Sequence, residues 1–298
     1  MGYLFLSISL LAGATKGFCG KKTSGYAANS TSAVLINLIR MSMCVLFSAI
    51  LMLLMGDIKS LTLDPKVISV SAISGVSTSL FVVTWLLSVR KNAYMMVDVF
   101  LMLGTIVPMS MGFFIFSERI LIRQWIGFVI LVLAAIIMCS YSNSIKVKLT
   151  PSAFVLLAIC GLANGITDFS QKWFVKSLPS TPVSVFNLYT YIFAAITLVV
   201  CYVFFSSKEK VKFEEKSKSS TKLIYLLIAI MSISLIACSY FKTLAAAYLD
   251  SAQLYPLNQG VALTLSTLMA AIFFKEKLNL KCVVGIVLSF IGLLIMNL

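Results

Sequence analysis

Ten long apolar segments constrain this sequence more than any other feature. A helix needs about 20 apolar residues to cross the hydrocarbon core of a bilayer. The expected spans are residues 3–20, 33–55, 67–89, 94–116, 121–142, 151–174, 182–205, 222–243, 250–274 and 279–297. Backbone groups in lipid must be satisfied internally, and the segments are too long for barrel strands, so each span is expected to be a helix. The sequence predicts an all-α integral membrane protein.

The composition of the 298-residue chain supports this class. Hydrophobic residues make up 60% of the chain and charged residues 11%, whereas a soluble domain is nearer half apolar and a quarter charged. The net charge of +14 arises mainly from lysines scattered among short connectors. Because membrane insertion favours basic connectors, we do not expect a nucleic-acid partner.

The chain contains no histidine and seven cysteines, each isolated within an apolar segment. The lack of histidine removes the usual proton shuttle and the commonest metal ligand. No cysteine spacing indicates zinc or a redox pair, and no glycine-rich loop ending in Lys-Ser/Thr indicates ATP hydrolysis. We therefore expect no metal site, no cofactor and no enzymatic activity.

The sequence repeats itself once. Residues 116–127 align with residues 274–285, which places Glu118 on Glu276, and residues 13–17 align with residues 161–165, which gives both segments a G-x-x-x-G pair. Each copy holds five spans, so we predict two five-helix repeats at residues 1–145 and 146–298. Five is an odd number, so the second copy enters the membrane inverted, as in many transporters.

The short connector between the third and fourth spans, near Arg90 and Lys91, predicts a tight antiparallel pair.

These features carry a family resemblance. Each five-helix half ends with a glutamate-bearing turn followed by a glycine-bearing span. This pattern resembles that of the drug/metabolite transporter superfamily, and of its EamA-type ten-helix members. Arg40 resembles an arginine found in the second helix of that family. Residues 255–260 and 274–279 are also similar to the small multidrug resistance transporters. The resemblance implies ten helices and a transport function.

The chain departs from the small multidrug resistance pattern at one important position. Those transporters carry a membrane-embedded glutamate in their first helix, where protons and cationic drugs compete. Alignment through Lys172 places that position at Asn164, and the internal repeat places its counterpart at Lys16. An amide and a cation replace the carboxylate, so exchange of protons for cationic drugs by that mechanism is not expected.

Polar residues inside the spans are the candidates for a solute site, because a bilayer makes such residues costly to keep. Asn164, Thr167, Asp168 and Gln171 recur at helical spacing and form one stripe. The stripe is expected either to line a cavity or to make polar contacts between helices. Lys16 is expected either to line the cavity or to be a structural lysine that reaches the interface.

Two further groups of candidates complete the predicted site. Arg40 either binds an anionic group with its planar fork or pairs with a carboxylate such as Asp98. The substrate-binding candidates are Lys16, Arg40, Asn164, Thr167, Asp168, Gln171, Tyr255, Asn258 and Gln259, and the secondary candidates are Asp98, Trp85, Tyr189 and Lys242. Lys242 and Tyr189 have the alternative of lying at the membrane interface.

We expect a secondary active transporter that moves a small organic metabolite, anionic or zwitterionic and amino-acid-like, by alternating access. One alternative is a broad-specificity exporter of drug-like or aromatic compounds, and another is a non-transporting membrane subunit or sensor. The expected partners are a small-molecule solute, the lipid bilayer and a coupling ion or proton. We expect a multi-pass protein of a bacterial plasma membrane, as a monomer or a homodimer.

The orientation of the chain is left open by two opposing signals. Connectors after odd-numbered spans, together with the ends of the spans that flank them, hold 15 Lys and Arg residues, against 6 for those after even-numbered spans. The positive-inside rule would place the odd connectors in the cytoplasm and both termini outside. The family resemblance implies the opposite, with both termini inside.

Overall fold

The computed structural model describes residues 1–90, 94–139, 151–211, 221–273 and 280–297. Within these residues the chain forms eleven α-helices and one short 3-10 helix. The elements are α1 (Gly2–Ser24), α2 (Ser30–Met55), η1 (Asp57–Ser60), α3 (Pro65–Arg90), α4 (Tyr94–Gly104), α5 (Ile106–Phe116), α6 (Ile122–Cys139), α7 (Pro151–Ser177), α8 (Val183–Ser206), α9 (Thr221–Tyr248), α10 (Ser251–Phe273) and α11 (Leu280–Asn297).

The helices follow the predicted spans, and the predicted all-α membrane fold is confirmed. Helices α4 and α5 share the fourth span, which breaks at Thr105. The Thr105 hydroxyl donates to the Met102 carbonyl at 2.7 Å, and Pro108 lacks the N–H that would continue the ladder across the break. Among the described residues, seven helical segments are long and apolar enough to cross a membrane.

The helix α2 shows how local sequence sets these boundaries. Asn29 precedes it and accepts a hydrogen bond from the Ser32 amide, while the Ser32 side chain accepts one from the Asn29 amide. This reciprocal capping box satisfies two amides that the first turn leaves free. The helix ends at Gly56, whose φ of 76° lies in the left-handed region that glycine adopts without strain.

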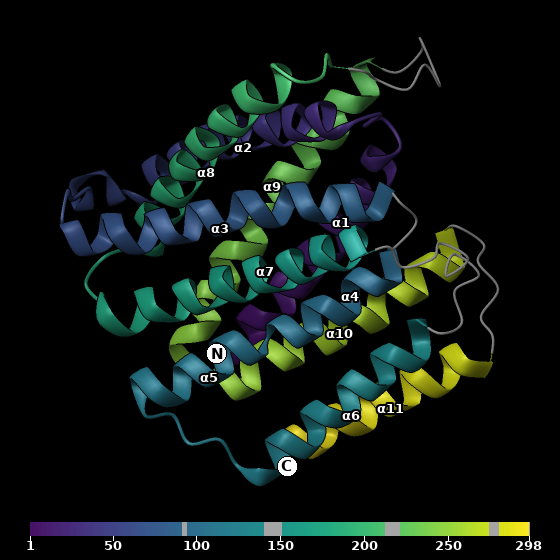
Figure 1. Ribbon diagram of the computed structural model, residues 1–298. Helices are drawn as coiled ribbons and strands as arrows, with labels where there is room; N and C mark the ends of the chain where they lie inside the picture. Colours follow the sequence, from purple (N-terminus) through teal and green to yellow (C-terminus); the bar gives the residue numbers. More distant parts are fainter. Residues whose placement is uncertain (91–93, 140–150, 212–220, 274–279, 298) are drawn as a thin grey trace.

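The two halves pack with a twofold pattern (Figure 1). Helix α1 packs against α9, and its counterpart in the second half, α7, packs against α3. Helices α4 and α5 pack on α7, just as α10 packs on α1. The pairs α2–α8 and α6–α11 bring counterparts together. The halves therefore interdigitate around a shared axis.

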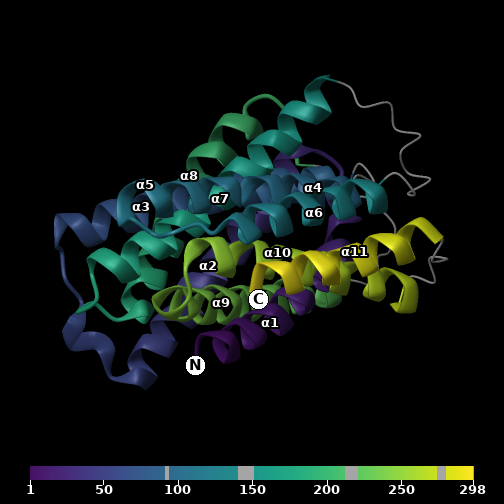
Figure 2. The ribbon, with the colours of Figure 1, turned by 90° about the horizontal axis from the view of Figure 1, so that it is seen from below.

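The second half is inverted relative to the first. A side chain at Gly2, the start of α1, would meet Leu249, and the ammonium of Lys172, near the end of α7, donates to the Leu249 carbonyl at 2.7 Å. The start of α1 and the end of α7 therefore lie at one end of the bundle. We call this the terminal end, because Tyr3 there donates to the Asn297 side chain at 3.2 Å, and both chain termini lie nearby (Figure 2).

The predicted pairing of the third and fourth spans is wrong. Helix α3 packs chiefly against α7 and α8, and α4 packs chiefly against α7 and α6. The interdigitated halves place α7 against both helices instead. The predicted repeat boundary between residues 145 and 146 lies outside the described residues.

The G-x-x-x-G pair of α7 forms a close helix contact. A Cβ at Gly161 would lie 2.2 Å from the Phe100 carbonyl oxygen, and one at Gly165 would lie 2.3 Å from the Gly104 carbonyl oxygen. The backbones of α4 and α7 therefore touch. The matching pair in α1 differs, since a Cβ at Gly13 would meet only the Cys238 sulfur at 3.7 Å. The close backbone contact that α7 makes at Gly161 and Gly165 is therefore not made by α1 at Gly13.

This difference predicts unequal effects of the same substitution. Gly161→Ala should lower the melting temperature strongly, because the obstructing atom is a backbone oxygen that cannot move aside, and overpacking costs about 1–3 kcal/mol or more. Gly13→Ala should melt close to the unaltered protein. Thermal unfolding in detergent measures both variants, and equal melting temperatures would contradict the α4–α7 contact.

Candidate functional site

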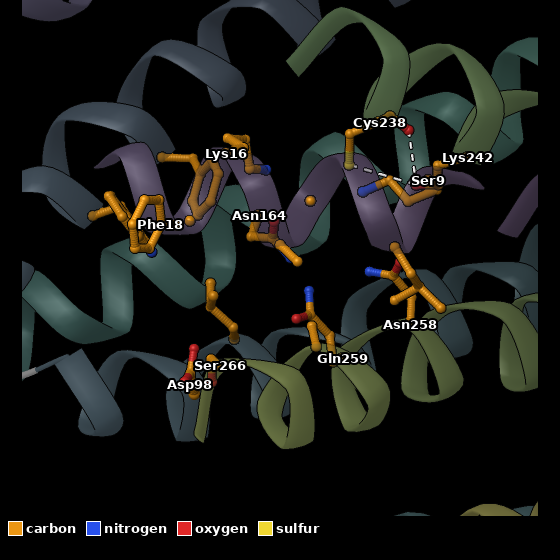
Figure 3. Close-up of a pocket in the computed structure, with 18 of the residues that line it drawn as sticks. Ser9, Lys16, Phe18, Asp98, Asn164, Cys238, Lys242, Asn258, Gln259 and Ser266 are labelled. Carbon is orange, nitrogen blue, oxygen red and sulfur yellow. Dashed lines mark hydrogen bonds between the residues drawn. The ribbon is translucent and has the colours of Figure 1, made fainter. Parts of the chain in front are cut away.

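A cavity of about 120 Å³ lies between the two halves. Its wall is built from α1, α2, α3 and α4 of the first half and α7, α9 and α10 of the second. Figure 3 shows side chains from α1, α4, α7, α9 and α10 around the same open space. Eight of the predicted site residues line it: Lys16, Arg40, Trp85, Asp98, Asn164, Lys242, Asn258 and Gln259.

Lys16 lies on the cavity wall, in the middle of α1. Its ammonium is 5.9 Å from the centre of the Phe81 ring, which is a favourable position for a cation. No carboxylate lies within 4.0 Å of it among the described residues. Gly13 and Gly17 lie on the same wall, and their lack of side chains leaves room beside the ammonium.

Arg40 lies on the cavity wall and is only 3% exposed. Its Nε and Nη2 atoms are buried and have no hydrogen-bond partner in the described part of the chain. The predicted alternative of an Arg40–Asp98 ion pair is absent from the same residues, where Asp98 accepts a hydrogen bond from Ser266 at 3.0 Å. A buried guanidinium with free N–H groups is costly unless something in the cavity accepts them.

Lys242, for which the sequence left open a cavity or an interfacial position, is buried and lines the cavity wall. Its Nζ lies 2.5 Å from Asp168 Oδ1, and its side chain is buried. Asn164 donates to the other oxygen of Asp168 at 3.3 Å. Asp168 is fully buried and is not on the cavity wall. Its charge therefore compensates Lys242 from behind the wall.

Thr167 and Gln171 turn away from the cavity. The Thr167 hydroxyl lies 2.9 Å from the Ser77 hydroxyl of α3. The Gln171 amide donates to the Ser239 hydroxyl of α9 at 3.2 Å. The α7 stripe thus divides: Asn164 faces the cavity, and the other members bind neighbouring helices.

Two predicted aromatic residues also lie outside the cavity wall. Tyr255 is fully buried, and its hydroxyl donates to the Asp168 carbonyl at 2.6 Å, which ties α10 to α7. Tyr189 donates to the Thr62 carbonyl at 3.0 Å, near the η1 connection. Both hydroxyls connect parts of the bundle rather than face the cavity.

Several wall residues were not predicted from the sequence, of which Cys238 is the clearest. Its thiol lies 3.5 Å from the Ser9 hydroxyl and faces the cavity (Figure 3). A signal was available, because Cys238 precedes Lys242 by four residues and so shares its helix face. Ser266 and Phe81 also line the wall. Single hydroxyl or aromatic side chains are common in apolar helices, so nothing in the sequence marks these two as cavity residues.

The wall carries an excess of positive charge. Lys16, Arg40 and Lys242 face the cavity, and only Lys242 has a carboxylate within ion-pair distance among the described residues. One carboxylate, Asp98, also lines the wall. In a region of low dielectric constant, charges of one sign strongly favour an oppositely charged occupant.

A second charged cluster closes the terminal end. Lys172 lies 2.7 Å from Glu118 Oε1 and donates to the carbonyls of Ala246 at 3.0 Å and Leu249 at 2.7 Å. Glu118 accepts the Ser251 amide at 2.8 Å. The lysine thus caps the end of α9 and the glutamate caps the start of α10, each complementing the helix dipole it faces.

The environment of Glu118 shifts its pKa. Burial acts to raise the pKa, but hydrogen bonds from Lys172 and Ser251, with the charge of Lys172, outweigh it and hold the pKa of the Glu118 carboxyl below its usual value. The carboxylate is therefore ionised at neutral pH, as the ion pair requires.

Comparison with known proteins gives three findings. The EamA-like transporter family matches residues 151–298. The quaternary ammonium compound-resistance protein QacG of Staphylococcus sp. (strain ST94) is 31% identical over 99 residues, which cover 32% of this chain and 91% of that protein. A crystal structure superposes with a TM-score of 0.76 at 14% identity, covering 99% of this chain and 95% of the other. At that identity the superposition shows a shared fold alone.

Proposed function

Because this chain belongs to the drug/metabolite transporter superfamily, as a multi-pass integral membrane protein, we propose that it is a secondary active transporter for a small organic anion. The class includes monocarboxylates, dicarboxylates and zwitterions such as amino acids. Members of the EamA-like family are membrane transporters. The identity of the solute and the mechanism below are our proposal.

The unpaired cations of the cavity wall carry this proposal. Lys16 and Arg40 have no carboxylate within 4.0 Å in the described residues, and two Arg40 nitrogens lack any acceptor there. A carboxylate placed between the two side chains accepts the free N–H groups and neutralises the charge. Arg40 is suited to this role, because its planar fork matches the two oxygens of a carboxylate.

The inverted symmetry supports alternating access. In transporters built from inverted repeats, the solute binds near the membrane midplane and the halves rock around it. Here the cavity lies between the halves, and the Glu118–Lys172 cluster joins the first half to α9 and α10 at the terminal end. We propose that the halves part at this cluster when the opposite state forms.

The similarity to QacG supports a second candidate function, the export of drug-like compounds. The printed name of that protein refers to resistance to quaternary ammonium compounds, which are permanent cations. The positive wall of this cavity disfavours such a solute, because Lys16 and Arg40 would repel it. Asn164 also replaces the carboxylate expected at the matching position.

A ligand-dependent melting experiment separates the two functions. Purified protein is heated with succinate, L-glutamate, L-phenylalanine or tetraethylammonium. A bound solute stabilises by mass action, by about 2.7 kcal/mol at a concentration one hundred times its Kd. We expect at least one carboxylate to raise the melting temperature and tetraethylammonium to leave it unchanged.

Flux then tests transport itself. The stabilising carboxylate should enter proteoliposomes in a saturable manner. Stabilisation by tetraethylammonium alone would support drug export, and stabilisation without flux would support a sensor or a non-transporting subunit.

A further inference from the structure

Asp98, a half-buried residue on the cavity wall, lacks the cationic partner that two buried carboxylates have. Asp168 pairs with Lys242, and Glu118 pairs with Lys172. The partner of Asp98 is a hydroxyl, since Ser266 Oγ donates to its Oδ2 at 3.0 Å. Within the described residues no Lys or Arg nitrogen lies within 4.0 Å of Asp98. Figure 3 shows Asp98 beside Ser266, across the open space from Lys242.

Asp98 shares the cavity wall with Lys16, Arg40 and Lys242, yet none of these cations lies within ion-pair distance of it among the described residues. Asp98 lies on α4, against α3, α6, α7 and α10. The charged group that acts on it is Lys21 of α1, and the titratable group nearby is the Cys160 thiol of α7. The described side chains of α3, α6 and α10 present no charged or titratable group to it. Its negative charge therefore has no cation in direct contact within the described residues.

An ionised carboxylate in such a place is costly and is relieved either by a cation or by a proton. A metal cation needs several oxygen ligands, and the described residues contain no cluster of three or more acidic, cysteine or histidine side chains. A proton needs only the carboxylate.

We propose that Asp98 is a proton-binding site that couples uptake of the organic anion to entry of a proton. The inference rests on the proposed transport function and concerns what drives it. The proton adds to the Asp98 carboxylate from one aqueous phase and leaves it to the other, so only one O–H bond forms and breaks.

Solute binding and proton binding are coupled because the solute and Asp98 share one cavity. A solute carboxylate held by Lys16 and Arg40 lies in the same cavity as Asp98. Two negative charges in a region of low dielectric constant repel each other, and protonation of Asp98 removes the repulsion. Each ligand therefore favours binding of the other, and the effect is reciprocal by linkage. Alternating access then carries both across the membrane.

Proteoliposomes that contain a pH-sensitive dye test the coupling. Labelled succinate, L-glutamate and L-phenylalanine are used as probes. With an acidic exterior, the unaltered protein should accumulate at least one probe, and the dye should report proton entry that depends on that probe. Asp98→Asn should lose accumulation at least tenfold, yet keep both the melting shift and the exchange of internal for external probe.

Three variants control this result. Asp98→Glu keeps a carboxyl and should keep coupling, and Asp98→Ser replaces the asparagine variant should that variant fail to fold. Asp64→Asn is the matched control: Asp64 lies outside the spans and caps α3 through the Lys66 amide at 2.9 Å, a role that asparagine fills equally well. It should transport like the unaltered protein.

Four outcomes would overturn the proposal. The first is pH-driven accumulation that persists in Asp98→Asn. The second is loss of the melting shift in that variant, since such a loss would make Asp98 a contact of the solute. A sodium gradient that replaces the proton gradient would also refute it, as would accumulation of the probe without proton entry in the unaltered protein. Failure of the proposed function looks different, because the unaltered protein then shows neither a melting shift nor exchange with any carboxylate.

Discussion

Replacing Arg40 with methionine should weaken binding of the stabilising carboxylate by at least about 30-fold. Removing one partner of a buried, hydrogen-bonded charge pair costs about 2–5 kcal/mol, and 1.4 kcal/mol corresponds to a factor of ten. Arg40 is 3% exposed, and its Nε and Nη2 lack partners in the described residues. Its guanidinium is therefore positioned for an anion that enters the cavity.

The same variant should fold at least as well as the unaltered protein. Replacing an uncompensated buried charge with an apolar side chain removes a desolvation cost, so the melting temperature without solute should stay unchanged or rise. Loss of binding together with preserved stability distinguishes a binding residue from a structural one. Calorimetric titration and thermal unfolding measure the two quantities separately.

Two control variants sharpen the Arg40 result. Arg40→Lys keeps the charge but loses the planar fork, so it should bind more weakly than the unaltered protein and more tightly than Arg40→Met. Arg123→Met removes a charge from the exposed start of α6 and should leave affinity unchanged. Unaltered affinity in Arg40→Met would refute the proposed anion site.

Replacing Lys172 with methionine should destabilise the protein by about 3–5 kcal/mol, the usual cost of removing one partner of a buried ion pair. The substitution leaves the Glu118 carboxylate buried without its cation and frees two carbonyls at the end of α9. Glu118→Gln should destabilise less, because its amide still has an oxygen that accepts the Ser251 amide.

A double-mutant cycle tests whether the two side chains act together. If they do, Glu118→Gln with Lys172→Met should be more stable than the sum of the single effects predicts. Lys176→Met is the matched control, because Lys176 lies one turn further along α7 and is exposed. Additive effects of the two substitutions would show that the ion pair contributes nothing of its own.

The ion pair also predicts a pH dependence. The pKa of Glu118 in the folded protein is held below its usual value, so its stabilising contribution is complete above the pKa of the unfolded chain. The contribution is lost as the pH falls through the lower, folded pKa, which places the loss below about pH 4. The melting temperature should fall there, and it should fall less in Glu118→Gln.

The sequence determined the spans, the all-α fold and the inverted repeat. These follow from local patterns: a bilayer requires about 20 apolar residues per helix, and a repeat of five spans is necessarily inverted. Most of the polar residues that line the cavity were also predictable, because lipid penalises a side chain such as Lys16 or Asn164 unless protein or water surrounds it.

The tertiary structure decided which of these residues face the cavity and which bind other helices. Asp168 and Lys242 are both charged residues inside apolar spans, yet Lys242 lies on the cavity wall and Asp168 lies behind it. Thr167 shares the α7 stripe with Asn164 but contacts Ser77 instead. A water-filled cavity and a neighbouring helix both remove the cost of placing a polar side chain in lipid, so the local sequence cannot distinguish the two positions. Packing between distant segments sets the rotation and the partners of each helix, and so decides which position each side chain takes.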